Sequence, residues 1–111
     1  MNIPFAAFTK MHNEVKKELL QDFHRVLEND WYIRGKEDEK FEQKFAEYLG
    51  RRYCIGCGNG LDAIMLGLKA LGVGAGDEVI IPSNTFIATA LAVSYVGATP
   101  VLVDPNIETY N

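Results

Sequence analysis

Three glycines within five residues form the most suggestive cluster in the sequence. Gly56, Gly58 and Gly60 follow a short apolar run and precede a second apolar run with helical character. Glycines let a backbone turn tightly and approach a ligand, and a helix beginning near Leu61 would present free N–H groups and the positive end of its dipole. The pattern predicts either a phosphate-binding turn or a tight strand-to-helix connection that binds nothing.

The segment PSNTF is a second loop that could take part in ligand binding. Ser83 or Asn84 is expected to cap a helix there, with Phe86 in the first helical turn. In an open parallel sheet, ligands bind at the carboxyl ends of the strands, where both loops would lie. A phosphate-binding turn beside an aromatic ring suits a small planar phosphorylated cofactor, and pyridoxal phosphate fits that description. Simple core packing is the alternative role for Phe86.

The two cysteines, Cys54 and Cys57, form a C-x-x-C pair. A zinc site would need two more ligands, and His12 and His24 lie well upstream with a spacing unlike that of a paired-histidine motif. A redox pair ordinarily opens a helix, whereas these cysteines end a predicted strand. We therefore expect two small buried residues beside the glycine turn and no metal site, with a redox pair as the less favoured alternative.

The elements that must position these loops alternate after Gly50. Strands are expected at RYCIGC, EVIIP and TPVLVD, with helices over 60–71 and 85–96, which gives a βαβαβ order. The strands are continuous apolar runs, and such strands are typical of a parallel sheet covered on both faces. The fold class is therefore predicted to be α/β with a partial parallel sheet.

Two amphipathic helices are expected before this alternation. Apolar residues recur at helical spacing over 11–28, and a second helix ends at Gly50, a residue type that commonly terminates helices. The predicted organisation is a helical segment over 1–50 followed by the start of an α/β domain over 51–111. Three strands make a thin sheet, so we expect the N-terminal portion of a larger protein.

Composition excludes several classes of partner. The 111 residues carry a formal net charge of -4, which repels a polyanion, so nucleic acid is not expected. The apolar runs are too short to span a bilayer, which predicts a soluble, cytoplasmic protein without a membrane partner.

The run NGLDAIMLGLKALGVGAGDEVIIPSNTFIATALAVSYVGATPVLVDPNIETYN resembles the N-terminal third of the DegT/DnrJ-type sugar aminotransferases. These are pyridoxal-phosphate enzymes of fold type I. Upstream, DWYIRGKEDEKFEQKFAEYLG resembles the helix before the family's first strand, and IPFAAF resembles its opening segment. Several motifs in order over essentially the whole chain carry the resemblance, which implies the N-terminal part of the large domain of that fold.

The resemblance also implies a set of site residues. Backbone N–H groups near Gly60, Leu61 and Asp62 would bind the cofactor phosphate, and Phe86 would stack on the cofactor ring. Leu61 stands where the family often has Thr or Ser, so the backbone must carry the phosphate binding. Asp62 is expected to cap the helix, because a carboxylate beside phosphate repels it.

The same resemblance places Trp31 and Tyr32 near the substrate pocket, with packing as the alternative. The implied reaction moves an amino group from an amino acid, expected to be glutamate, to a nucleotide-linked keto-sugar in amino-sugar or polysaccharide biosynthesis. A homodimer is implied for the full-length protein. The family's catalytic lysine would lie beyond Asn111, so no catalytic residue is assigned here and this chain is expected to be inactive alone.

Two other readings remain open. A non-catalytic fragment could bind a phosphate compound or act in regulation. The segment IGCGNG also looks like the first motif of S-adenosylmethionine-dependent methyltransferases. However, Cys54 stands where that motif usually has an acid, and EVIIPSN ends without the acid that would hold a ribose, so this reading is less favoured.

Overall fold

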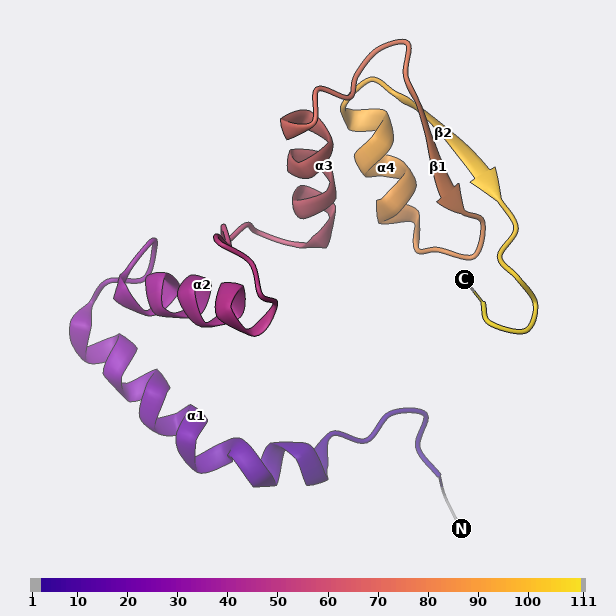
Figure 1. Ribbon diagram of the computed structural model, residues 1–111. Coiled ribbons are helices and arrows are strands. Elements are labelled where there is room, and N and C mark those ends of the chain that lie inside the picture. Colours follow the sequence, from indigo (N-terminus) through magenta and orange to yellow (C-terminus); the bar gives the residue numbers. More distant parts are fainter. Residues whose placement is uncertain (1–2, 111) are drawn as a thin grey trace. The chain divides into compact units, whose positions relative to one another are not determined.

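The computed structural model describes residues 3–110 and contains four helices and two strands in that range (Figure 1). The chain divides into two compact units, Met1–Gly56 and Cys57–Asn111. Of these residues, Met1, Asn2 and Asn111 lie outside the described range. No helix among residues 3–110 is both long enough and apolar enough to cross a membrane.

The first unit is built from α1 (Thr9–Asn29) and α2 (Lys36–Tyr48), so both predicted helices are confirmed. The apolar residues of α1 recur at helical spacing, yet no α1 residue is buried, and Ala46 is the one buried residue of α2. The amphipathic faces of both helices are therefore largely exposed within this unit.

Gly50 ends the second helix, as its position in the sequence indicated. Its φ of 62° lies in the left-handed region, which glycine adopts without a steric cost. The N–H of Gly50 donates to the carbonyl of Glu47 at 3.0 Å, and the N–H of Arg51 donates to the carbonyl of Ala46 at 2.8 Å. These paired bonds satisfy carbonyls that the helix end would otherwise leave free.

The second unit contains α3 (Gly60–Ala70), β1 (Glu78–Pro82), α4 (Ile87–Tyr95) and β2 (Thr99–Val103). The two strands pair in parallel, in a register that runs from Glu78 opposite Thr99 to Pro82 opposite Val103. Helix α4 contacts both strands, and α3 packs against α4. The α/β class with a parallel sheet is thus confirmed.

The core of this unit lies between α4 and the sheet. Ile81, Val93 and Ala98 form its buried centre. Along β1 the side chains alternate, with Ile81 only 4% exposed and its neighbour Ile80 70% exposed, and Leu102 on β2 is 62% exposed. The expectation of a sheet covered on both faces is therefore wrong for the described residues, because the described helix contacts cover one face.

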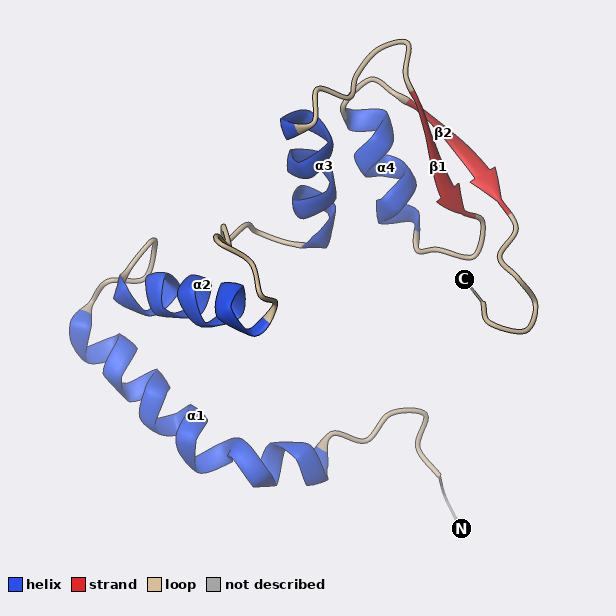
Figure 2. Cartoon of the chain, in the orientation of Figure 1, coloured by secondary structure: helices blue, strands red, loops and turns tan. Residues whose placement is uncertain are grey.

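The strand predicted at RYCIGC does not form, and this segment is drawn as loop between α2 and α3 (Figure 2). A strand exists only where its backbone pairs with another strand. Within residues 3–110 the sheet has two strands, and neither pairs with this segment. The N–H of Gly56 donates instead to Oε1 of Glu42 on α2, at 2.6 Å.

Candidate functional site

The glycine turn leads into α3 through Asn59, which is the N-cap residue. Its Oδ1 accepts a hydrogen bond from the N–H of Asp62 at 2.9 Å, and its Nδ2 donates to Oδ2 of Asp62 at 3.0 Å. The expectation that Asp62 caps the helix is therefore wrong. Asparagine is a favoured N-cap because its short side chain reaches the free N–H groups of the first turn.

Two backbone donors at the start of α3 are unpaired. Among the described residues, no protein group accepts a hydrogen bond from the N–H of Gly60 or Leu61, whereas the N–H of Asp62 is taken by Asn59. The helix has 11 residues, so its dipole adds partial positive charge at this end. This end of α3 therefore offers two N–H groups to an anion.

The space around the turn differs between its glycines. A Cβ added at Gly60 would meet nothing within 4 Å, so this side of the helix start is open. A Cβ added at Gly58 would lie 2.9 Å from Oδ2 of Asp62, closer than real Cβ contacts. The backbone at Gly60 is therefore open to approach by a ligand. The nearby carboxylate of Asp62 is held by Asn59 and opposes an anion.

Phe86 is the N-cap residue of α4 and precedes its first turn, since the helix begins at Ile87. Neither Ser83 nor Asn84 caps this helix, so that expectation is wrong. Ser83 Oγ donates instead to Oδ1 of Asp104 at 2.8 Å. The Phe86 side chain is 77% exposed, which argues against simple core packing within this unit.

The two loops lie at one edge of the second unit. The N-terminal ends of α3 and α4 are on the same side as the arrowheads of β1 and β2 (Figure 1). Because α3 packs against α4, Gly60 and Phe86 lie at the N-terminal ends of neighbouring helices. Parallel strands with helical crossovers produce this arrangement by their topology.

Trp31 and Tyr32 belong to the first unit, in the connection between α1 and α2. Both side chains are exposed, at 58% and 57%. Trp31 Nε1 donates to the carbonyl of Ile33 at 2.8 Å, and the hydroxyl of Tyr32 donates to Oδ1 of Asp30 at 3.2 Å. Asp30 and Arg34 have positive φ angles of 50° and 51°, so the connection is a sharply turned loop.

An ion-pair cluster joins the two helices on either side of this loop. Arg25 on α1 donates from Nε and Nη2 to the two carboxylate oxygens of Glu37 on α2, at 3.2 and 3.1 Å, and also pairs with Asp22. Lys40 Nζ lies 2.9 Å from Oε1 of Glu37. Hydrogen bonds from Arg25, and then from Lys40, lower the pKa of Glu37 to about 2. The same bond to Glu37 raises the pKa of Arg25.

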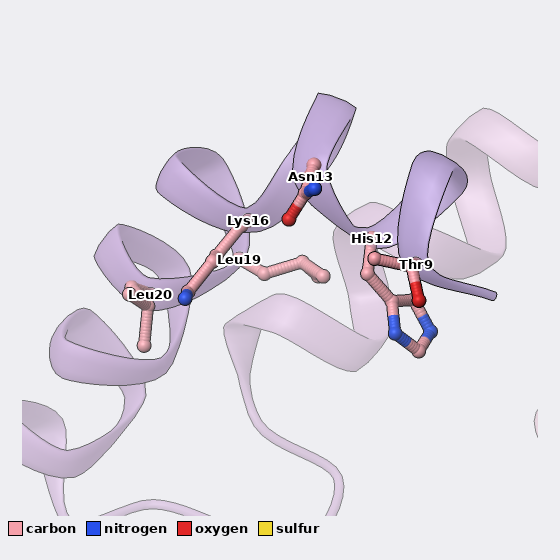
Figure 3. A pocket seen from close by; sticks show the side chains of 6 residues that line it. All are labelled: Thr9, His12, Asn13, Lys16, Leu19 and Leu20. Carbon is pink, nitrogen blue, oxygen red and sulfur yellow. The ribbon is translucent and has the colours of Figure 1, made fainter.

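A surface hollow of about 500 Å³ runs along α1 (Figure 3). None of the predicted site residues lines it. Its lining residues all come from this single helix: Thr9, His12, Asn13, Lys16, Leu19 and Leu20. Within residues 3–110, no group of three or more His, Cys, Asp or Glu side chains is arranged to hold a metal ion, and both cysteines are free thiols. The expectation that both are buried is wrong, because Cys57 is exposed and Cys54 is half-buried in a segment that forms a loop and not a strand.

Sequence reasoning missed three contacts at these loops: the Asn59 cap, the bond from Ser83 to Asp104, and the bond from Gly56 to Glu42. The first had a local signal, because an asparagine three residues before an acid at a helix start follows a capping pattern. The other two join residues 21 and 14 positions apart, so no local pattern could have indicated them.

Comparison with known proteins gives a consistent result. The model of the DegT/DnrJ/EryC1/StrS aminotransferase family matches residues 13–111. A dTDP-3-amino-3,6-dideoxy-alpha-D-galactopyranose transaminase from Aneurinibacillus thermoaerophilus is 55% identical over 109 residues, which is 98% of this chain and 30% of that protein. The chain thus spans about 30% of the length of the curated relatives that it matches.

Solved structures agree with this match. The crystal structure of S. venezuelae DesV in complex with a ketimine intermediate has a TM-score of 0.87 at 44% identity, over 94% of this chain and 28% of that one. The structure of NtdA from Bacillus subtilis with bound cofactor PMP has a TM-score of 0.86 at 40% identity, over 95% of this chain and 24% of that one.

Proposed function

Because the chain belongs to the DegT/DnrJ/EryC1/StrS aminotransferase family, we propose that the protein is a pyridoxal-phosphate-dependent sugar aminotransferase. The proposed reaction transfers an amino group from an amino acid, with glutamate as the donor, to a nucleotide-linked keto-sugar. In this proposal the chain contributes the N-terminal part of the cofactor-binding domain. The two open N–H groups at the start of α3, with the exposed Phe86 at the start of the neighbouring helix α4, carry the proposal.

The phosphate of the cofactor would bind at the glycine turn. The N–H groups of Gly60 and Leu61 are the available donors, and the open space at Gly60 admits a phosphate oxygen close to the backbone. Asp62 would take part through its N–H only if Asn59 released it. The leucine at position 61 supplies no hydroxyl, so the backbone and the helix dipole provide the attraction.

The ring of the cofactor would stack on Phe86. A phenyl face exposed at a helix start can cover a planar heteroaromatic ring while the phosphate occupies the neighbouring helix start. When bound, pyridoxal phosphate supplies an electron sink for the carbon from which the amino donor loses its proton. The proposal assigns the residues of this chain to binding and orienting the cofactor, and assigns the proton transfer to none of them.

Trp31 and Tyr32 are proposed to contact the sugar substrate. Their rings are exposed, and an internal hydrogen bond fixes each polar atom to the same loop. Flat aromatic faces pack well against the apolar faces of sugar rings. The ion pair between Arg25 and Glu37 supports this loop from its two flanking helices.

The proposal includes a cytoplasmic homodimer in which residues 1–50 form a helical segment and residues 51–111 begin the cofactor-binding domain. The exposed apolar residues on α1, such as Leu19 and Phe23, supply a surface that association would bury. The net charge of -4 argues against nucleic acid as a partner.

The test is a half-reaction with the whole protein loaded with pyridoxal phosphate. Glutamate is added without a sugar acceptor, and released 2-oxoglutarate is measured. The proposal expects about one equivalent per subunit, because the amino group remains on the cofactor until a keto-sugar accepts it. Cofactor binding without release of 2-oxoglutarate would favour a non-catalytic phosphate-ligand-binding protein instead.

A further inference from the structure

Two hydrogen bonds tie the residue after β1 to the end of β2. The last pair in the strand register is Pro82 opposite Val103. Beyond it, the N–H of Ser83 donates to the carbonyl of Val103 at 2.8 Å, and Ser83 Oγ donates to Oδ1 of Asp104, also at 2.8 Å. The second bond has an ionised acceptor, and such bonds are stronger than those between neutral groups.

Ser83 begins the turn that leads to Phe86. The N–H of Thr85 closes this turn on the carbonyl of Pro82 at 3.3 Å, and Thr85 Oγ1 lies 2.8 Å from Oγ1 of Thr89 in α4. Phe86 therefore follows a segment anchored on one side to β2 and on the other to its own helix. Its backbone is extended, with φ of -69° and ψ of 144°.

The ring of Phe86 has little packing to hold it within this unit, since it is 77% exposed. Its location depends on the backbone from which it projects, and that backbone depends on the anchors on either side. We infer that Asp104, acting through Ser83, is a positioning residue for the Phe86 ring. This inference rests on the proposed function, because the location of the ring matters only if the ring stacks on the cofactor.

Stacking is sensitive to such positioning. Favourable aromatic pairs have ring centroids within about 4.5–7 Å in offset or edge-to-face geometry, so a displaced backbone weakens the contact. Phosphate binding at the start of α3 uses different groups, the N–H groups of Gly60 and Leu61. Loss of the bond between Ser83 and Asp104 should therefore weaken binding of the whole cofactor while leaving binding of inorganic phosphate unchanged.

The experiment is an equilibrium titration of the whole protein with pyridoxal phosphate and, separately, with inorganic phosphate. Ser83→Ala and Asp104→Ala are expected to raise the Kd for pyridoxal phosphate roughly 2- to 10-fold, the range for loss of one hydrogen bond. The double variant should equal either single variant, because both remove the same bond. Asp104→Asn keeps an oxygen acceptor and should restore most of the affinity.

Two reference variants separate the possible outcomes. Phe86→Ala tests the stacking itself, and Ser94→Ala removes an exposed serine near the opposite end of α4 as a matched control. If Phe86→Ala leaves the affinity for pyridoxal phosphate unchanged, the stacking role in the proposed function is wrong, and the inference fails with it.

If Phe86→Ala weakens binding but Ser83→Ala and Asp104→Ala do not, the positioning role alone is overturned. A loss of affinity for inorganic phosphate equal to the loss for pyridoxal phosphate would also overturn it, because that result indicates a general disturbance of the unit. The inference is supported if the alanine variants lose affinity for pyridoxal phosphate but not for inorganic phosphate, and if Asp104→Asn restores the affinity for pyridoxal phosphate.

Discussion

The side chain of Asn59 contacts Asp62 twice, accepting from its N–H at 2.9 Å and donating to its carboxylate at 3.0 Å. This pair determines which donors at the start of α3 remain available. It removes the N–H of Asp62 from the set and leaves those of Gly60 and Leu61. It also holds the Asp62 carboxylate in the turn, where Gly58 leaves room for it.

Replacing Asn59 with alanine should destabilise the second unit. The N–H of Asp62 would lose its acceptor, and loss of an N-cap side chain lowers the free energy of unfolding by about 1 kcal/mol. Urea denaturation followed by circular dichroism measures the change. Asn59→Ser keeps a capping oxygen and should recover most of the loss. Equal stability of the two variants would contradict the capping role.

Two glycines of the turn should respond differently to alanine. At Gly58, a new Cβ would lie 2.9 Å from Oδ2 of Asp62, so the Asn59–Asp62 contact must shift. At Gly60 the Cβ has open space, and alanine should leave stability unchanged within about 0.5 kcal/mol or raise it slightly, by restricting the unfolded chain. Thermal melts of both variants give the comparison. A Gly60 variant that is the less stable of the two would contradict the open space at Gly60 and the close contact at Gly58.

Glu42 should hold the segment before the glycine turn. Its Oε1 accepts a 2.6 Å hydrogen bond from the N–H of Gly56, which lies inside the segment RYCIGC that the sequence predicts to be a strand. Glu42→Ala should speed hydrogen exchange at the Gly56 amide and lower the free energy of unfolding by about 1 kcal/mol. Glu42→Gln keeps an acceptor oxygen and serves as the control. Unchanged exchange in the alanine variant would exclude this contact in solution.

Lowering the pH should weaken the ion pair between Arg25 on α1 and Glu37 on α2 over a defined pH range. Hydrogen bonds from Arg25 and Lys40 lower the pKa of Glu37 from an ordinary value of 4.5 to about 2. The stabilisation by ionised Glu37 is therefore fully present above pH 4.5 and is lost as the pH falls through 2. Carboxyl chemical shifts measured by NMR should place the Glu37 midpoint near 2.

The variant Arg25→Met supplies the control for this titration. It removes the first and largest cause of the shift, so the Glu37 midpoint should move up toward 4.5, with Lys40 holding it somewhat below that value. In urea denaturation, Glu37→Gln should be less stable than the unchanged protein at pH 6, and the difference should disappear as the pH falls below 2. A wild-type midpoint near 4.5 would show that the ion pair does not persist in solution.

The sequence predicted those elements whose signals are local. Strand β1 has the predicted bounds, Glu78–Pro82, and α3 begins at Gly60 as expected. The helical periodicity and the end of α2 before Gly50 also depend only on residues close together in the sequence. The order of helices and strands in the second unit, and the placement of both loops at one edge of the sheet, follow from that local information and from topology.

The remainder depended on partners distant in sequence. The segment RYCIGC has strand-like composition, but a strand needs a paired backbone, and none of the described strands supplies it. Ser83 lies three residues before Phe86, the N-cap residue of α4, and its hydroxyl donates to Asp104, so Ser83 does not cap this helix. The contact from Arg25 to Glu37 spans 12 positions and crosses a loop with two left-handed residues, which no periodicity indicates.

The central claim is that the open N–H groups of Gly60 and Leu61 bind the phosphate of pyridoxal phosphate. The most direct measurement compares the Kd values of the whole protein for pyridoxal phosphate and for pyridoxal, which lacks the phosphate. The account predicts much tighter binding of pyridoxal phosphate, competition by inorganic phosphate, and loss of this preference in Gly60→Pro, which removes one donor. Equal affinity for the two compounds, or a preference that survives in Gly60→Pro, would contradict the account.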